Sequence, residues 1–222
     1  MNEMIFASWQ RIAAGKHEVD LLSMYKGMPV IHRAQVQFVY EEAVHIAPYS
    51  YKSICLSLSK NVIALSDLLD EPVNAVVQKV DLAAGTAILE NFSYVSGHLG
   101  DRMSPRVEPR TSFEVQLESG GKTFDGAVVD LSISGVGVYV TGEGANRLRA
   151  RSIVRFSLPL PDETLQLLGV IRHVKRATQG SRLGIAFEPG TNLRAVFTYI
   201  NHRRAELLEE LEQLYQTALS QQ

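Results

Sequence analysis

The sequence predicts a mainly β protein: two small antiparallel β-barrel domains followed by a long C-terminal helix. In two blocks, residues 20–95 and 113–187, short β-branched segments alternate apolar with polar residues and are separated by turn residues. This pattern is typical of strands in small barrels. From residue 192 the apolar period changes to three or four, which indicates an amphipathic helix. We therefore expect domains at 1–96 and 97–191 and a helix at 192–222.

The first domain begins with a predicted short helix over residues 2–14. Ile5, Trp9 and Ile12 lie at near-helical spacing, and Gly15 is suited to end the helix. Strands are then predicted at 29–31, 36–40, 43–46, 53–58, 61–65, 72–80 and 86–92. Several short strands at this spacing favour a small antiparallel barrel or sandwich.

The second domain follows a predicted linker at residues 93–101, which contains Gly97 and Gly100. Its strands are predicted at 113–117, 124–129, 136–140, 153–158, 165–175 and 183–187. In the C-terminal helix, leucines repeat at helical spacing beside four glutamates. The acidic second half of this helix leaves pairing with a second copy, a homodimer, open.

Two arginines, Arg102 and Arg106, open the second domain. Pro105 and Pro109 keep this segment out of a helix, because proline fixes φ and biases the preceding residue toward extended backbone. We therefore expect a loop or linker that presents two guanidinium groups.

A polar corner interrupts the strands that follow. Apolar residues run into Asp130, Ser132 and Gly135 and then resume at a period of two as Val136, Val138 and Val140. Such a pattern predicts a hairpin whose corner carries polar side chains.

In order and spacing, Arg102-xxx-Arg106 and Asp130-x-Ser132-xx-Gly135 resemble the two-part signature of the PilZ family of bacterial cyclic di-GMP receptors. The resemblance implies a PilZ barrel in the second domain, with cyclic di-GMP as its ligand and no cofactor. Many family members carry a further arginine just before the first motif, where this chain has Asp101. This difference from the family pattern bears on the affinity for cyclic di-GMP.

The ligand's chemistry explains these residue types. Cyclic di-GMP has two phosphodiesters and two guanines, and the planar forks of Arg102 and Arg106 suit both phosphate and the O6 and N7 atoms of guanine. An ionised Asp130 can accept hydrogen bonds from guanine N1–H and the exocyclic amine. Ser132 can add a contact or fix the turn, and Gly135 permits positive φ or close backbone approach. No residue of this set acts as a nucleophile or acid, so the site is expected to bind without catalysis.

The first domain is similar, in pattern and position, to the N-terminal β domain of two-domain family members such as the flagellar-brake group. A split barrel and a second PilZ-like barrel both fit, and the domain carries neither motif, so we assign it no ligand. The arginines begin where the domains join. We therefore expect nucleotide binding to change domain orientation and to expose or cover a surface for a protein partner. The resemblance implies outputs such as motility, biofilm or polysaccharide export.

Composition and missing motifs limit other functions. Cys55 is the single cysteine of the 222 residues, so no internal disulfide can form and a reducing compartment is expected. No stretch has the pattern of a signal peptide or the length of a membrane span, which predicts a cytoplasmic protein. The sequence has no HExxH, Cys-His cluster, GxSxG, P-loop or Rossmann fingerprint, so neither a metal site nor an enzyme is expected.

Two alternatives stay open. One is an interaction adaptor whose PilZ-like barrel has lost nucleotide binding. The other is a single-strand nucleic-acid binder built on a small barrel. Residues 101–204 hold 15 Lys and Arg against 10 Asp and Glu, an excess that suits a small anion better than a long polyanion. We therefore expect no DNA or RNA partner.

Overall fold

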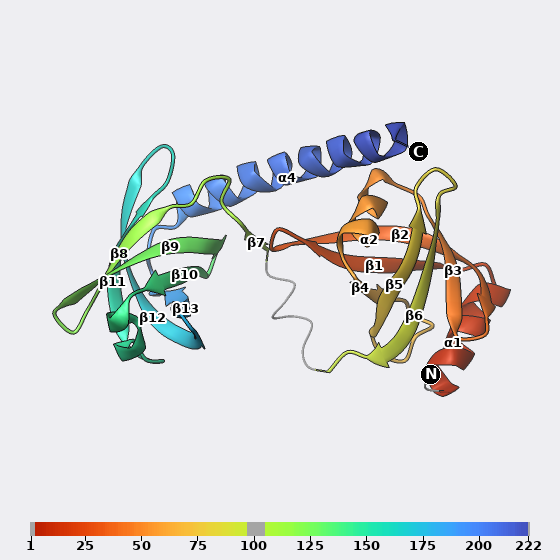
Figure 1. Ribbon diagram of the computed structural model, residues 1–222, viewed down its shortest axis with the longest axis horizontal. Helices are drawn as coiled ribbons and strands as arrows, with labels where there is room; N and C mark the ends of the chain where they lie inside the picture. Colours follow the sequence, from red (N-terminus) through yellow and green to blue (C-terminus); the bar gives the residue numbers. More distant parts are fainter. Residues whose placement is uncertain (1–2, 97–104, 222) are drawn as a thin grey trace. The chain divides into compact units, whose positions relative to one another are not determined.

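The computed structural model describes residues 3–96 and 105–221. Contacts divide the chain into two units, Met1–Met103 with Glu206–Gln222 and Ser104–Ala205. Each unit contains a closed antiparallel barrel, and a C-terminal helix contributes residues to both (Figure 1). The prediction of a mainly β protein with two antiparallel barrels and a C-terminal helix is confirmed.

The first unit is a six-stranded barrel with strand order β1-β2-β3-β6-β5-β4, closed by the pairing of β1 with β4 (Figure 1). Its elements are α1 (Glu3–Ala14), β1 (Glu18–Tyr25), β2 (Met28–Tyr40), β3 (Ala43–Pro48), η1 (Tyr51–Ser53), α2 (Ile54–Leu58), β4 (Asn61–Leu65), β5 (Val73–Asp81) and β6 (Thr86–Tyr94). The apolar face of α1 joins the barrel core through Ile5, Trp9 and Ile12. The Trp9 ring lies 5.4 Å from the ring of Phe92, centroid to centroid.

The strand predicted at 53–58 is wrong, because these residues form the end of η1 and the short helix α2. Ile54, Cys55 and Leu56 are consecutive and all buried, so this apolar run lacks the alternation that would separate a strand from a helix. The connection runs from β3 to β4, which are not neighbours in the barrel. A short apolar run cannot be assigned to helix or strand by its period alone.

Strand β1 is also missing from the predicted set. Leu21, Leu22 and Ser23 are all buried, so this strand departs from the alternation on which the prediction depends.

The second unit contains β7 (Arg106–Val107), β8 (Glu114–Ser119), β9 (Lys122–Ser132), β10 (Gly135–Thr141), η2 (Glu143–Arg147), β11 (Ile153–Pro159), β12 (Thr164–Ala177) and β13 (Gly180–Phe187). The sheet order is β10-β13-β12-β11-β8-β9-β7, and the additional pairing of β10 with β9 closes six of these strands into a barrel. The two-residue strand β7 is added on β9. Strand β9 therefore has three strand partners, β7, β8 and β10.

Helix α4 (Arg194–Ser220) begins in the second unit, where Val196 and Ile200 are buried. Its later part, from Glu206, groups with the first unit. There the Lys26 ammonium donates a 2.6 Å hydrogen bond to the Glu210 carboxylate. No helix in the described part of the chain is both long and apolar enough to cross a bilayer.

Candidate functional site

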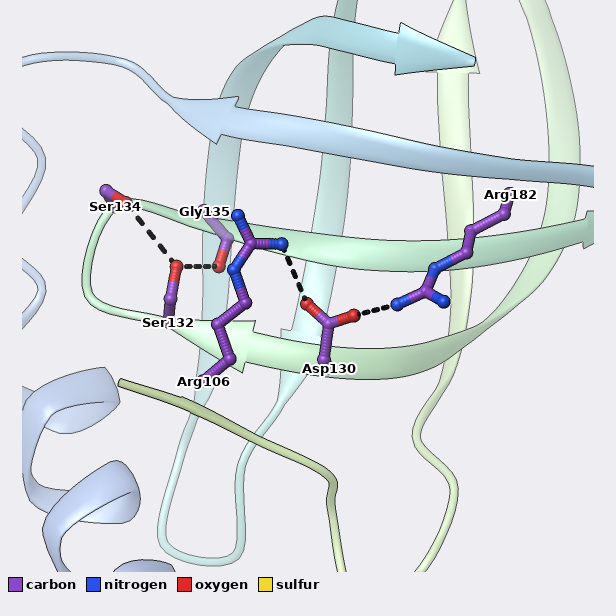
Figure 2. A network of polar contacts seen from close by, with 6 residues as sticks. All are labelled: Arg106, Asp130, Ser132, Ser134, Gly135 and Arg182. Carbon is purple, nitrogen blue, oxygen red and sulfur yellow. Dashed lines mark hydrogen bonds and ion pairs between the residues drawn. The ribbon is translucent and has the colours of Figure 1, made fainter. Parts of the chain in front are cut away.

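Strand pairing brings the described motif residues together although they come from separate segments. Arg106 of β7 pairs with Ser132 of β9, and Ser132 pairs in turn with Gly135 of β10. One step along the same two strands, Asp130 pairs with Gly137. Figure 2 shows Arg106, Asp130, Ser132 and Gly135 gathered at this end of β9. Arg102, the other predicted arginine, lies outside the described residues.

A β-bulge in β9 turns Asp130 toward this site. Gly137 pairs with Asp130 and Val138 with Val128, so the intervening Val129 is an extra residue in β9. Val128 and Leu131 are both core residues, although a regular strand would place them on opposite faces. Because the extra residue shifts the phase of alternation, Asp130 and Ser132 leave the core face and join Arg106.

Asp130 is held between two guanidinium groups (Figure 2). Its Oδ1 lies 3.6 Å from Nη1 of Arg106, and its Oδ2 accepts a hydrogen bond from Nη2 of Arg182 on β13. The Asp130 side chain is 7% exposed, whereas those of Arg106 and Arg182 are about half exposed. A buried carboxylate is costly unless it is paired. The two arginines thus let an ionised acid lie below the surface with its position fixed.

Gly137 leaves the space that the Asp130 carboxylate occupies. A Cβ at this position would lie 2.6 Å from Asp130 Oδ2 and 2.9 Å from its Cγ. Any side chain larger than hydrogen would therefore push the carboxylate away from its two arginines.

Ser132 and Gly135 shape the corner of the β9–β10 hairpin. The Ser132 hydroxyl donates to the Gly135 carbonyl oxygen at 3.1 Å and lies 3.4 Å from the Ser134 hydroxyl (Figure 2). Ser132 thus fixes the turn, one of its two expected roles. Gly135 has no positive φ. A Cβ there would lie 2.3 Å from the carbonyl oxygen of Ile185, so close approach of β13 is what requires glycine.

These residues line a hollow of about 200 Å³, whose other walls include Arg172 and His173 of β12. Drug-sized ligands usually occupy ~300–1,000 Å³. A ligand as large as a dinucleotide would therefore extend from the hollow onto the surrounding surface. The hollow offers arginine donors and one carboxylate acceptor, which suit the recognition of an anion that carries polar bases.

Sequence reasoning missed Arg172, His173 and Arg182. Arg182 reaches Asp130 only through the pairing of β13 with β10 and of β10 with β9, which no local pattern reveals. The sequence contains one indication of Arg172 and His173, because they are two adjacent polar residues inside an alternating strand. Such a pair can mark a bulge. Within the described ranges, no group of three or more His, Cys, Asp or Glu side chains is placed to hold a metal ion.

Comparison with known families matches residues 101–201 to the PilZ domain. Among similar solved structures is the Bacillus subtilis inhibitor of motility MotI/DgrA, with 11% identity and a TM-score of 0.43, covering 86% of this chain and 96% of that one. The K. pneumonia MrkH complex with c-di-GMP has 14% identity and a TM-score of 0.40, with coverage of 97% and 95%. Escherichia coli YcgR in complex with c-di-GMP has 10% identity and a TM-score of 0.39, with coverage of 98% and 94%. No curated protein sequence matches the chain.

Proposed function

Because residues 101–201 of this chain are a PilZ domain, we propose that the protein is a bacterial receptor for cyclic di-GMP. The observation that carries the proposal is the convergence of Arg106, Asp130 and Ser132 around one hollow. The proposed role is binding, because the arginine and aspartate side chains described at the hollow suit recognition of an anion and of a base edge.

Asp130 is the proposed reader of a guanine edge. A carboxylate offers about four lone-pair sites, and Arg106 and Arg182 approach one oxygen each. The remaining sites can accept the N1–H and amine donors of guanine side by side. Adenine lacks the N1–H donor, so this arrangement favours guanine over adenine.

The guanidinium of Arg106 is the proposed partner of a ligand phosphate or of guanine O6 and N7. Its side chain is 54% exposed, so it can turn from Asp130 to an incoming ligand without unfolding the strand. Arg102, outside the described residues, is proposed as a second clamp on the same chemical grounds.

We further propose that binding changes the relative orientation of the two units and so exposes or covers a surface for a protein partner. In the sequence, Arg106 follows the boundary between the units by only a few residues. If the ligand binds more tightly to one arrangement of the two units than to the other, it shifts the equilibrium toward the first. The size of the shift is set by the difference between the two affinities. Motility, biofilm or polysaccharide export are the expected outputs, in the cytoplasm.

Calorimetric titration with cyclic di-GMP tests the proposed site and reports stoichiometry. The wild-type protein should bind. Arg106→Ala and Asp130→Ala should each weaken binding by about tenfold or more, because hydrogen bonds to charged groups contribute ~1.5–3 kcal/mol. Asp125→Ala is the matched control, since Asp125 lies on the same strand but its carboxylate accepts from Gln116 and is exposed. Unchanged affinity in both site variants would refute this site.

One observation favours a second candidate, a protein-interaction adaptor that does not bind nucleotide. The Arg106–Asp130–Arg182 network can serve as a structural clasp, because it already pairs the carboxylate without any ligand. This alternative predicts no heat with cyclic di-GMP from a folded wild-type protein, together with a loss of thermal stability in Asp130→Ala.

A further inference from the structure

Strand β12 contains a second β-bulge, and the residue that it inserts is Arg172. Ile171 pairs with Ile185 and the next pair is His173 with Gly184, so Arg172 has no partner in the ladder. Ile171 is fully buried, whereas Arg172 and His173 are both exposed. In a regular strand one of these two polar residues would face the core. The bulge places both on the outer face.

The same two residues line the hollow that contains Arg106 and Asp130. The two bulges, in β9 and in β12, therefore act on one site from different strands of the barrel. Bulges often re-aim side chains beside functional sites. Here each one brings a charged residue, Asp130 or Arg172, to the wall of the hollow.

The charge balance of the hollow gives Arg172 a role. Arg106 and Arg182 share the carboxylate of Asp130, so these three groups together carry one net positive charge. Cyclic di-GMP brings two negative phosphodiesters. Within the described part of the chain, Arg172 forms no ion pair or hydrogen bond with another side chain. Its guanidinium therefore adds a second net positive charge that no carboxylate described here neutralises.

We propose that Arg172 is an additional ligand-binding arginine that contacts a phosphodiester of the bound nucleotide. This inference rests on the proposed function and assigns a residue that lies outside both sequence motifs. Arg172 would bind the anion, while Asp130 would read the base, so the two contributions are separable.

The test is titration of the full-length Arg172→Ala and Arg172→Lys variants with cyclic di-GMP at low and high salt. Arg172→Ala should weaken binding by about 10- to 100-fold, as expected for a lost charge-assisted contact. Arg172→Lys should recover part of the affinity, since lysine keeps the charge but loses the bidentate fork. The wild-type protein should lose more affinity than Arg172→Ala as salt rises, because salt screens the added charge.

Lys175→Ala is the matched control. Lys175 is an exposed cation on the same strand and does not line the hollow, so its removal changes the net charge equally but should leave affinity within about twofold. Thermal unfolding checks that each variant remains folded.

The outcomes separate this inference from the proposed function. Binding by the wild-type protein that is weakened by Arg106→Ala but unchanged by Arg172→Ala would overturn the role of Arg172 and leave the receptor intact. Equal losses in Lys175→Ala and Arg172→Ala would also overturn it, because the effect would then be general electrostatics. Absence of binding by the wild-type protein would overturn both proposals.

Discussion

At the scale of single residues, two glycines of β10 serve the site in different ways. A Cβ at Gly137 would meet the carboxylate of Asp130, the movable end of a side chain. A Cβ at Gly135 would instead meet the backbone carbonyl of Ile185, which belongs to a paired strand and cannot move alone. Substitutions at the two glycines should therefore have different effects. A side chain at Gly137 displaces the carboxylate, whereas one at Gly135 disturbs the pairing of the barrel strands.

Gly137→Ala should weaken cyclic di-GMP binding, because the carboxylate is displaced, while the paired strands of the barrel stay in register. Gly135→Ala should cost about 1–3 kcal/mol of stability, as overpacking does. Urea unfolding and calorimetry on both variants provide the measurements. A Gly137→Ala protein that binds with wild-type affinity would contradict the role given to Asp130.

The burial of His32 predicts that the stability of the first unit depends on pH. Burial, together with the nearby positive charge of Lys52, lowers the pKa of His32 to about 4, although Asp20 acts in the opposite direction. Both ring nitrogens lack a hydrogen-bond partner among the described residues. The folded state therefore keeps the ring neutral, while the unfolded chain takes up a proton at the ordinary pKa of about 6.5.

We expect the free energy of unfolding to be constant above about pH 6.5 and to fall as the pH drops from there toward 4, since only the unfolded state gains a proton in that window. Between pH 7 and pH 5 the loss should be roughly 2 kcal/mol. His32→Leu should remove most of this dependence in urea unfolding, whereas His17→Gln, at an exposed position, should retain it. An equal pH dependence in wild type and His32→Leu would show that other groups are responsible.

At the scale of elements, helix α4 anchors the segment that carries Arg106. Arg203 is 3% exposed, and its Nε donates a 3.0 Å hydrogen bond to the carbonyl oxygen of Glu108, two residues after Arg106. The short strand β7 is paired with β9 over two residues only. The helix therefore supplies a tether that such a short strand lacks.

We predict that Arg203→Met will cost about 1–3 kcal/mol of stability, because it leaves the Glu108 carbonyl without this donor. It should also weaken cyclic di-GMP binding through greater motion of Arg106. Arg194→Ala, an exposed arginine on the same helix, is the control. Hydrogen exchange at residues 106–108 reports the fraying directly, and unchanged protection there would argue against the tether.

At the scale of the whole molecule, the expected change in domain orientation can be measured by fluorescence energy transfer. Dyes can be attached selectively, because Cys55 is buried and burial raises the pKa of its thiol to about 12, which suppresses the reactive thiolate. New cysteines at the exposed positions Lys79→Cys and Lys122→Cys place one dye in each unit.

We expect saturating cyclic di-GMP to change the transfer efficiency of the wild-type background but not that of the Asp130→Ala background. The reason is that a ligand shifts an equilibrium only by its difference in affinity for the two arrangements. Constant efficiency in a protein shown by calorimetry to be saturated would exclude reorientation as the output.

The sequence by itself determined the fold class and the family of residues 101–201. Alternation at a period of two and its change after residue 192 predicted two barrels and a helix, which are confirmed. The PilZ resemblance that follows from Arg102, Arg106 and the Asp130 corner is confirmed by the family match. These features are local or are carried by short motifs, so a single chain displays them. The proposed ligand roles of the motif residues remain predictions.

Tertiary structure alone decided which other residues join the site. The bulges at Val129 and Arg172 set which side chains face outward, and the pairing of β13 with β10 brings Arg182 to Asp130. It also decided that residues 53–58 include a helix. Register between strands depends on pairing energies summed over the whole barrel, and one inserted residue reverses the faces of all residues after it. A local sequence pattern therefore does not reveal the register between the strands.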